Sequence, residues 1–230
     1  VLGSTSVQIS QGDATALKIR GDADDLEKEP FFIKRNALVL GKSRSHRGAQ
    51  FDELRFRVVI PDLQELKVKG SGSAYVKPFA LLESDGGDAP TVQVEGSGDI
   101  KLYGIEGAAI ELRVNGSGDI KVVKLDVAEV EAVVAGSGDL FIQNLRAERG
   151  EFVITGAGDI EVTEDSFVEQ IEISVVGSGD ADLSRVSCDR AEMNIVGSGN
   201  ADIGEVREQL NASVLGSGDI RHGGDPEVES

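Results

Sequence analysis

A glycine-rich tripeptide recurs along the chain at a nearly constant interval. Gly-Ser-Gly, or Gly-Ala-Gly in one copy, begins at Gly70, Gly96, Gly116, Gly136, Gly156, Gly177, Gly197 and Gly216. The intervals are 26, 20, 20, 20, 21, 20 and 19 residues. Because self-similarity at a period of about 20–50 residues is the signature of repeat architectures, we expect a stack of similar units.

Apolar residues alternate with other residues on both sides of each tripeptide. The position two residues before the first glycine is Val or Ile in all eight copies, and the positions four before and four after are also apolar throughout. Strict alternation over such runs indicates half-buried strands rather than helices. Each period therefore predicts a strand, a glycine turn, a second strand and a third short segment.

The period predicts how these strands stack. Twenty residues of strand, at about 3.3 Å each, form one closed circuit of three short sides. Circuits stacked about 4.8 Å apart place equivalent residues in columns and bury one continuous core. The predicted fold is all-β, a single-stranded parallel β-helix (a β-solenoid) of about eight coils. We expect it to be right-handed, as parallel crossovers generally are.

The glycines are expected to form the corners of the coils. A sharp corner between strands needs a positive φ, and stacked corners bring backbones so close that a Cβ at every level would clash. The predicted turn glycines are Gly96, Gly98, Gly116, Gly118, Gly136, Gly138, Gly156, Gly158, Gly177 and Gly179.

The repeat also divides the chain. Residues 1–62 lack the tripeptide and are interpreted as an N-terminal β cap or as atypical first coils. Residues 63–222 are interpreted as the solenoid, and residues 223–230 as a tail without a further coil or a cap. The long first interval predicts a loop at residues 84–90.

One apolar column carries an irregularity. The residue nine positions after the first glycine is apolar in most copies, but it is Asp165 in the fifth, where Phe167 or Val168 is expected to take its place. Cys188 falls outside the columns that the alternation defines, so we expect it to lie between coils.

Composition excludes several classes of function. The net charge is −18, from 41 acidic and 23 basic residues, so phosphate backbones repel the chain and no nucleic-acid partner is expected. No apolar run approaches the roughly 20 residues that span a membrane. One cysteine and two histidines leave no disulfide framework and scarcely any transition-metal site. Because the sequence begins at Val1 and not at Met, we expect that a signal peptide has been removed.

The order of motifs resembles a known family. Residues 9–13 (Ile-Ser-Gln-Gly-Asp), 17–22 (Leu-Lys-Ile-Arg-Gly-Asp), 38–40 (Leu-Val-Leu) and 59–63 (Val-Ile-Pro-Asp-Leu) precede the Gly-Ser-Gly-Asp repeats. This order, over nearly the whole chain, is similar to the head GIN domain family of auto-transporter adhesins. The resemblance implies an all-β solenoid from a bacterial envelope or a secreted protein. It implies no enzyme activity, since the family has no assigned catalytic residues.

A column of acidic residues follows the turns. The residue after the tripeptide is an aspartate in six copies: Asp99, Asp119, Asp139, Asp159, Asp180 and Asp219. It is Ser73 in the first copy and Asn200 in another. Each Asp is expected to accept hydrogen bonds from turn N–H groups. The alternative is a ladder of bound cations, with Ca²⁺ as the only cofactor considered, because hard cations take carboxylate oxygens.

The strand before each turn presents an outward face that changes along the repeat. Early copies place charged residues there, and later copies place apolar ones: Val133, Val153, Val176, Val196 and Leu215. A contiguous exposed apolar surface often marks a contact site. These five residues form the candidate interface, and we expect a homo-oligomer or another envelope protein as the partner.

An enzyme acting on acidic polysaccharide is the remaining alternative. The loops are short, no histidine lies near the turn serines in sequence, and the only tyrosines are Tyr75 and Tyr103. The main hypothesis is therefore a non-enzymatic protein of the periplasm, outer-membrane surface or cell exterior that acts by surface contact or self-association. A cation-binding structural spacer is the second hypothesis, and the polysaccharide-active enzyme is the third.

Overall fold

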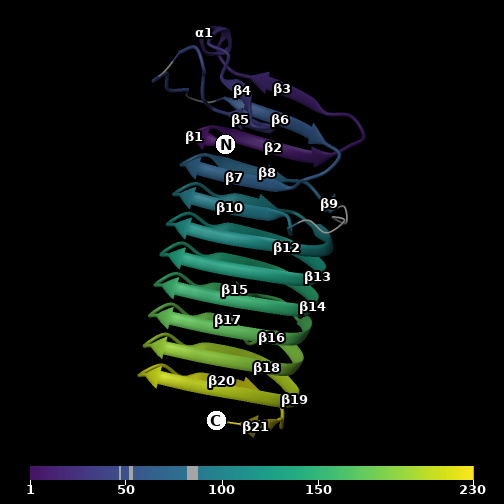
Figure 1. The fold of residues 1–230 in the computed structure, drawn as a ribbon, viewed down its shortest axis with the longest axis vertical. Helices are drawn as coiled ribbons and strands as arrows, with labels where there is room; N and C mark the ends of the chain where they lie inside the picture. Colours follow the sequence, from purple (N-terminus) through teal and green to yellow (C-terminus); the bar gives the residue numbers. More distant parts are fainter. Residues whose placement is uncertain (47, 52–53, 82–87, 230) are drawn as a thin grey trace.

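The computed structural model describes residues 1–46, 48–51, 54–81 and 88–229. The chain winds into a tall column of stacked coils, with the N-terminus toward one end and the C-terminus at the other (Figure 1). Within these ranges, 19 strands join one continuous sheet, and β4 (Phe31–Lys34) and β5 (Ala37–Leu40) form a separate hairpin. The predicted all-β parallel solenoid is confirmed, with about seven turns where the glycine turns predict eight coils.

Equivalent residues of successive coils pair in parallel. Val114 pairs with Val94 on one side and with Val134 on the other, each 20 residues away. The loop predicted at residues 84–90 lies outside the described residues up to Gly87. The strands of the repeat region are β7 (Glu65–Gly70), β8 (Ser73–Val76), β9 (Phe79–Ala80), β10 (Thr91–Gly96), β11 (Ile100–Leu102), β12 (Ile105–Gly116), β13 (Ile120–Gly136), β14 (Leu140–Gly156), β15 (Ile160–Val162), β16 (Ser166–Gly177), β17 (Ala181–Leu183), β18 (Val186–Gly197), β19 (Ala201–Gly216) and β20 (Ile220–Gly223).

The core is a set of inward-facing columns inside the coils. Val94, Val114 and Val134 have no exposed surface, and the neighbouring column of the same strands is equally buried. Burying one such side chain contributes roughly 1.5–3 kcal/mol. The large ring of Phe152 fits into the core because its neighbour Gly150 has no side chain. A Cβ on Gly150 would overlap that ring. Each coil packs only on the coils beside it, so stability accumulates coil by coil.

The first eleven residues already belong to the solenoid. β1 (Leu2–Gly3) pairs in parallel with β7, and β2 (Ser6–Gln11) pairs in parallel with β8, so that Gly3 lies beside Gly70. Residues 3–6 (Gly-Ser-Thr-Ser) therefore occupy a turn, as a degenerate copy of the motif. Residues 1–62 were expected to be either a β cap or atypical first coils. The first eleven residues form an atypical first coil.

A different arrangement follows toward the N-terminal end of the column. β6 (Arg55–Ile60) pairs in parallel with β2, but β3 (Ala16–Arg20) pairs antiparallel with β6 (Figure 1). The short helix α1 (Ala23–Glu27) lies beyond them, whereas the β4–β5 hairpin lies level with them in Figure 1, with Gly41 next to Leu2 of β1. These elements have the character of the expected β cap, because they break the parallel ladder at the end of the sheet.

The segment interpreted as a tail is partly a strand. β21 (Glu227–Glu229) pairs in parallel with β19, and Val228 lies beside Leu210. β20 also pairs with β19, so the coil continues past the last glycine turn. The expectation that no further coil follows is wrong, because β21 pairs in parallel with β19 after the two glycines at 223 and 224, past a register shift between Ile203 and Glu205.

Two predictions about the third side of the coil are also wrong. Ser166, not Phe167 or Val168, stands beside Val186 in the interrupted column. Its buried hydroxyl accepts a hydrogen bond from the Leu145 N–H at 2.9 Å and donates one to the Glu164 carbonyl at 2.8 Å, so a polar side chain is satisfied there. Cys188 is fully buried in the core of β18 and not between coils, because it continues the inward alternation two residues after Val186.

Candidate functional site

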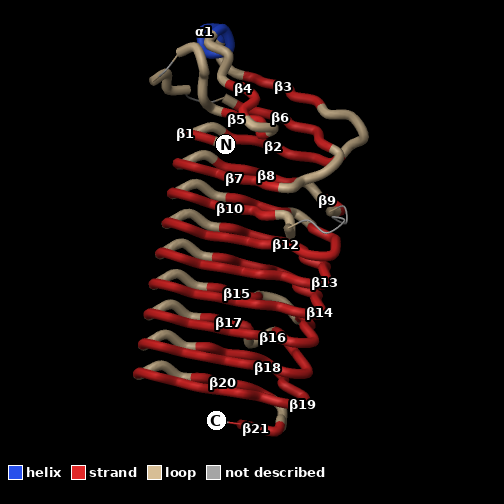
Figure 2. Tube along the Cα trace, viewed as in Figure 1, coloured by secondary structure: helices blue, strands red, loops and turns tan. Residues whose placement is uncertain are grey.

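The glycine turns form one edge of the column, visible as the row of tan arcs in Figure 2. Gly116 has a φ of +145°, a conformation that side-chain-bearing residues rarely adopt. A Cβ on Gly116 or Gly118 would overlap a carbonyl oxygen of the coil above. That close approach lets the N–H groups of Ser117 and Gly118 donate to the Gly96 carbonyl at 2.9 and 3.0 Å.

The aspartate after each turn makes a hydrogen bond to the next coil. The backbone N–H of Asp119 donates to Oδ1 of Asp99 at 3.1 Å. The same bond recurs from Asp139 to Asp119 at 3.1 Å, from Asp159 to Asp139 at 2.9 Å, from Asp180 to Asp159 at 2.8 Å and from Asn200 to Asp180 at 2.7 Å. Asn200 then accepts from the Asp219 N–H at 3.1 Å, so an amide performs the same function without a charge. Turn hydrogen bonding thus accounts for one carboxylate oxygen in five of the six aspartates.

This arrangement offers no cage for a cation. Ca²⁺ takes about six to eight oxygen ligands. Among the residues the structure describes, no group of three or more His, Cys, Asp or Glu side chains is placed to hold a metal ion. The column aspartates are spread one to a coil, and the Oδ1 atoms of five already accept backbone N–H groups. Calcium binding by this column stays a prediction, without a site that fits it.

The predicted apolar interface lies on the outward face of the strand before each turn. Val176, Val196 and Leu215 occupy adjacent rungs and are 44%, 47% and 71% exposed. Val133 and Val153 pair with each other in the neighbouring column and are half-buried. We call these five residues the valine face. The structure therefore brings the five together in two adjacent columns.

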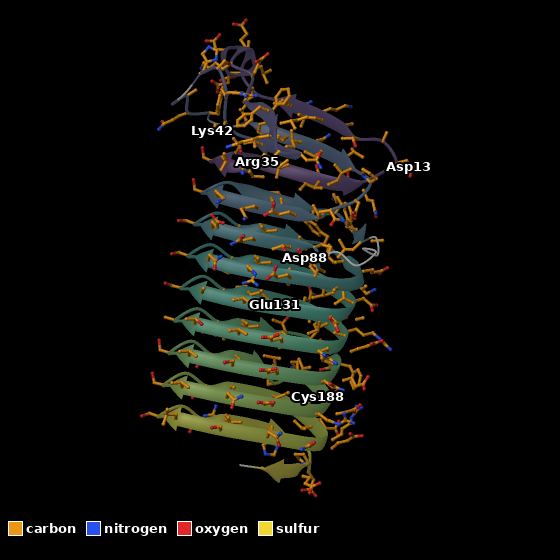
Figure 3. The ribbon with its side chains drawn as sticks, in the orientation of Figure 1. Asp13, Arg35, Lys42, Asp88, Glu131 and Cys188 are labelled. Atoms are coloured by element: carbon orange, nitrogen blue, oxygen red, sulfur yellow. The ribbon has the colours of Figure 1, made fainter. Side chains whose placement is uncertain are left out.

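A second column on the same face escaped the sequence analysis. Five glutamates stack beside the valine face, one per coil: Glu111, Glu131, Glu151, Glu172 and Glu192. We call them the glutamate ladder, and Glu131 is labelled in Figure 3. In the sequence, each of these glutamates stands five residues before the first glycine of a turn. The valine face comes from the positions one and three residues before that glycine.

Charge along the ladder is unevenly compensated. Arg113 pairs with Glu111, and its guanidinium lies 3.0 Å from Oε1 of Glu131. Within the described ranges, the side-chain carboxylates of Glu151 and Glu172 have no hydrogen bond or ion pair. Desolvation, followed by the carboxylates of Glu131 and Glu172, raises the pKa of Glu151 above its usual range, although Arg113 acts in the opposite sense.

Shallow grooves run beside the ladder. One of about 430 Å³ is lined by Arg149, Glu151, Glu172 and Arg190, among others, and one of about 480 Å³ continues from Arg149 and Glu151 toward Glu111. In the first groove one wall is acidic and the other holds arginine and glutamine, whereas the second groove has Glu129 beside Arg149. The face as a whole is a strip of exposed valines bordered by carboxylates.

A serine and a histidine meet elsewhere, in the cap. Oγ of Ser45 lies 3.2 Å from Nδ1 of His46, and Ser43 lies 3.2 Å from Ser45. Both Ser45 and His46 are exposed on one loop. No described carboxylate contacts this histidine, so the group that orients the base in a nucleophilic site is missing from the part of the loop that is described.

Comparison with known proteins identifies the kind of chain. The family described as "Putative auto-transporter adhesin, head GIN domain" matches over residues 1–168 and again over residues 164–226. A search of curated proteins finds no match. In the described residues, no helix has the length and apolar character needed to cross a bilayer.

Solved structures share the fold. A "putative adhesin" from Parabacteroides distasonis is 20% identical with a TM-score of 0.73, covering 100% of this chain and 90% of that one. A "putative lipid binding protein" from the same organism is 22% identical with a TM-score of 0.71, covering 99% and 85%. A "putative adhesin" from Parabacteroides merdae is 19% identical with a TM-score of 0.61, covering 99% and 85%. At these identities the likeness shows the fold alone.

Proposed function

The chain belongs to the family described as "Putative auto-transporter adhesin, head GIN domain", and from that membership we propose a non-enzymatic, adhesin-like protein of the bacterial envelope or cell exterior. It acts by contact through its solenoid surface, and the contact includes a second copy of itself. The family description supports an adhesin and not an enzyme. The order of motifs, from the cap to the repeats, agrees with that assignment.

The observation that carries this proposal is the valine face. Val176, Val196 and Leu215 expose side chains on three successive rungs, where a solenoid surface would ordinarily carry polar groups. Contact between two such faces removes this apolar surface from water, at roughly 25 cal/mol per Å². The flat, regular sheet needs no rearrangement to make that contact.

The glutamate ladder sets the conditions under which the contact forms. Two copies that meet through the valine face bring two acidic columns close together. Like charges at the border oppose association at low ionic strength, and salt screens them over about 10 Å at 0.1 M. We therefore expect self-association to strengthen as salt is raised. That dependence is opposite to the one expected for a contact held by ion pairs.

Light scattering after size exclusion tests the proposal. Val176→Glu with Val196→Glu should convert the oligomer to a monomer while the circular dichroism spectrum stays that of a β-protein. Thr163→Glu with Ser184→Glu adds the same charge at two exposed positions of adjacent coils outside the valine face and serves as the matched control, which should leave the oligomer intact. A wild-type monomer at every salt concentration, or a double variant that still assembles, would contradict self-association through this face.

A further inference from the structure

A line of cations and aromatic rings runs along one outward face, from the cap strands β3 and β6 onto the strands that follow the turns and the residues just past them. We call it the basic stripe; it comprises Lys18, Arg57, Lys77, Lys101 and Lys121, with the rings of Tyr75, Tyr103 and Phe141. Strand pairing sets these residues side by side: Lys18 with Arg57, Arg57 with Gln8, Gln8 with Tyr75, Tyr75 with Lys101, Lys101 with Lys121, and Lys121 with Phe141. The stripe therefore crosses β3, β6, β2, β8, β11, β13 and β14 without a break.

The positive charges of the stripe are mostly uncompensated. Lys18, Arg57, Lys77 and Lys101 have no ion pair among the residues described, and Lys121 alone lies near a carboxylate, 3.4 Å from Oδ2 of Asp119. This absence is notable because acidic residues outnumber basic ones by 41 to 23. Four cations with no ion pair among the described residues, in so acidic a chain, point to an anionic partner.

Aromatic rings hold three of the ammonium groups in place. The Nζ atoms of Lys77 and Lys101 lie 5.2 and 5.0 Å from the centre of the Tyr103 ring, and Nζ of Lys121 lies 5.1 Å from that of Phe141. Cation–π contacts restrict the lysine side chains without neutralising them. The cost of ordering these lysines when an anion binds is correspondingly smaller.

The shape of the stripe indicates an extended ligand. Its N-terminal end is hollowed by a concavity of about 380 Å³ lined by Gln8, Lys18 and Arg57 together with Ser10, Ala16 and Val59. Tyr75 and Tyr103 are 43% and 37% exposed. Successive rungs are separated by about 4.8 Å, so the cations form a line and not a single pocket.

Along the basic stripe, the charge of the side chains changes from positive to negative after Phe141. The next three rungs are Glu161, Asp182 and Asp202. These carboxylates repel a polyanion, so the stripe has a defined end near the middle of the solenoid. An anionic chain would thus occupy the half of this face that includes the cap.

We infer that the basic stripe binds a linear anionic polysaccharide that carries carboxylate or sulfate groups. Lysine and arginine contact the anionic groups along the line, and the exposed part of Tyr75 offers an apolar surface to a sugar ring. A second copy of the chain fits less well. Pairing Lys101 and Lys121 with Asp182 and Glu161 of an antiparallel copy would leave Lys18 and Arg57 unopposed. The site is separate from the valine face, so it stands or falls independently of self-association.

Binding of polygalacturonate, measured by isothermal titration calorimetry, tests this inference. Neutral dextran is the control ligand, and anionic phosphatidylglycerol vesicles test the membrane alternative. Lys101→Glu with Lys121→Glu should weaken polygalacturonate binding by at least about tenfold, since each lost charge contact also becomes a repulsion. Arg185→Glu with Arg190→Glu makes the same change of charge on later coils and should leave affinity within about twofold. Lys101→Gln with Lys121→Gln provides a milder variant should charge reversal disturb folding.

The outcomes separate the alternatives. Binding of polygalacturonate that falls with salt, is absent for dextran and is lost in the stripe variants supports the inference. Equal loss in both charge-reversal pairs would overturn it, because general electrostatics would then explain the binding. No binding of polygalacturonate, or binding of the vesicles alone, would also overturn it. Loss of oligomerisation in the stripe variants, without polygalacturonate binding by the wild type, would assign the stripe to a second copy.

Discussion

Oδ1 of Asp119 accepts a hydrogen bond from the backbone N–H of Asp139, one coil further on, at 3.1 Å. The side chain of one coil thus forms a hydrogen bond with the backbone of the next, at a turn whose remaining side chain is an exposed serine between two glycines. Asn200 makes the equivalent bond with its amide oxygen. The bond therefore needs an oxygen at this position and not a negative charge.

Substitution of Asp119 should separate these two properties. Asp119→Ala removes the acceptor and should lower the free energy of unfolding by about 1 kcal/mol, the usual net value of such a bond. Asp119→Asn keeps the acceptor and removes one of the stacked charges, so stability should stay the same or rise. Thermal melting of the three proteins measures this. A loss of stability in Asp119→Asn equal to that in Asp119→Ala would show that charge is required.

Alanine in the turn should be far more damaging than alanine in a nearby buried glycine. At Gly118 a Cβ would overlap the Gly98 carbonyl oxygen, and the backbone on both sides is fixed by the stack. Gly118→Ala should therefore cost about 3 kcal/mol or more. Gly104→Ala is the control, because its Cβ would lie 3.7 Å from the nearest atom, in Pro78. Equal melting temperatures for the two variants would contradict the close stacking of the turns.

The glutamate ladder predicts a pH-dependent stability. The folded state raises the pKa of Glu151, through desolvation and then through Glu131 and Glu172, so ionisation of this carboxyl opposes folding once the pH exceeds the raised value. Glu151→Gln should thus raise the melting temperature at pH 7. The advantage should vanish below the ordinary pKa of 4.5, where the carboxyl is protonated in both states.

Glu148→Gln, at an exposed position of the same strand outside the ladder, is the control for that experiment. It should change the melting temperature little at either pH. A Glu151→Gln advantage that is constant from pH 4 to pH 7 would mean that packing, and not ionisation, is responsible.

Cys188 should be inert in the folded protein. Desolvation in the core, followed by the nearby charge of Asp189, raises the pKa of this thiol to about 12, although Arg207 opposes the shift. The reactive thiolate is therefore scarce at pH 8, and the side chain is fully buried. A disulfide reagent should modify Cys188 only as fast as the protein unfolds, and quickly in denaturant. Rapid labelling of the native protein would contradict the burial.

The inward columns could be predicted from the sequence because they obey one rule. Val94, Val114 and Val134 are two residues before a glycine turn, and each is completely buried. The prediction fails where a polar residue occupies an inward position. Ser166 fills an apolar column because its hydroxyl finds two backbone partners, which only the neighbouring coils reveal.

The first coil was hidden for a similar reason. Residues 3–6 carry threonine where the tripeptide has its second glycine, so a search for the motif passes over them. The turn tolerates the Cβ of Thr5 because no glycine turn precedes it in the column, and the Thr5 hydroxyl donates to the Leu2 carbonyl at 3.2 Å. Strand pairing with residues some 67 positions later identifies the coil, and no local pattern encodes such a pairing.

The outward residues were predicted less completely, for a physical reason. Burial constrains every inward position to apolar types, whereas an outward residue is constrained only by its neighbours on adjacent rungs. The valine face was visible as a column, and the glutamate ladder would have been visible two positions further from the turn. The basic stripe escaped detection because it begins in Lys18 and Arg57, whose strands lie outside the repeat and join it only by pairing.

Because inward and outward residues alternate, the outward residues can vary without changing the fold. Because glycine turns and buried columns alone maintain the stack, each outward column can change its chemistry from rung to rung at little cost in stability. One vertical line accordingly passes from lysine to glutamate within two coils, at Lys121, Phe141 and Glu161. The solenoid is thus a scaffold with a regular repeat. Separate surface patches can be lengthened, moved or exchanged by whole coils while the buried core stays the same.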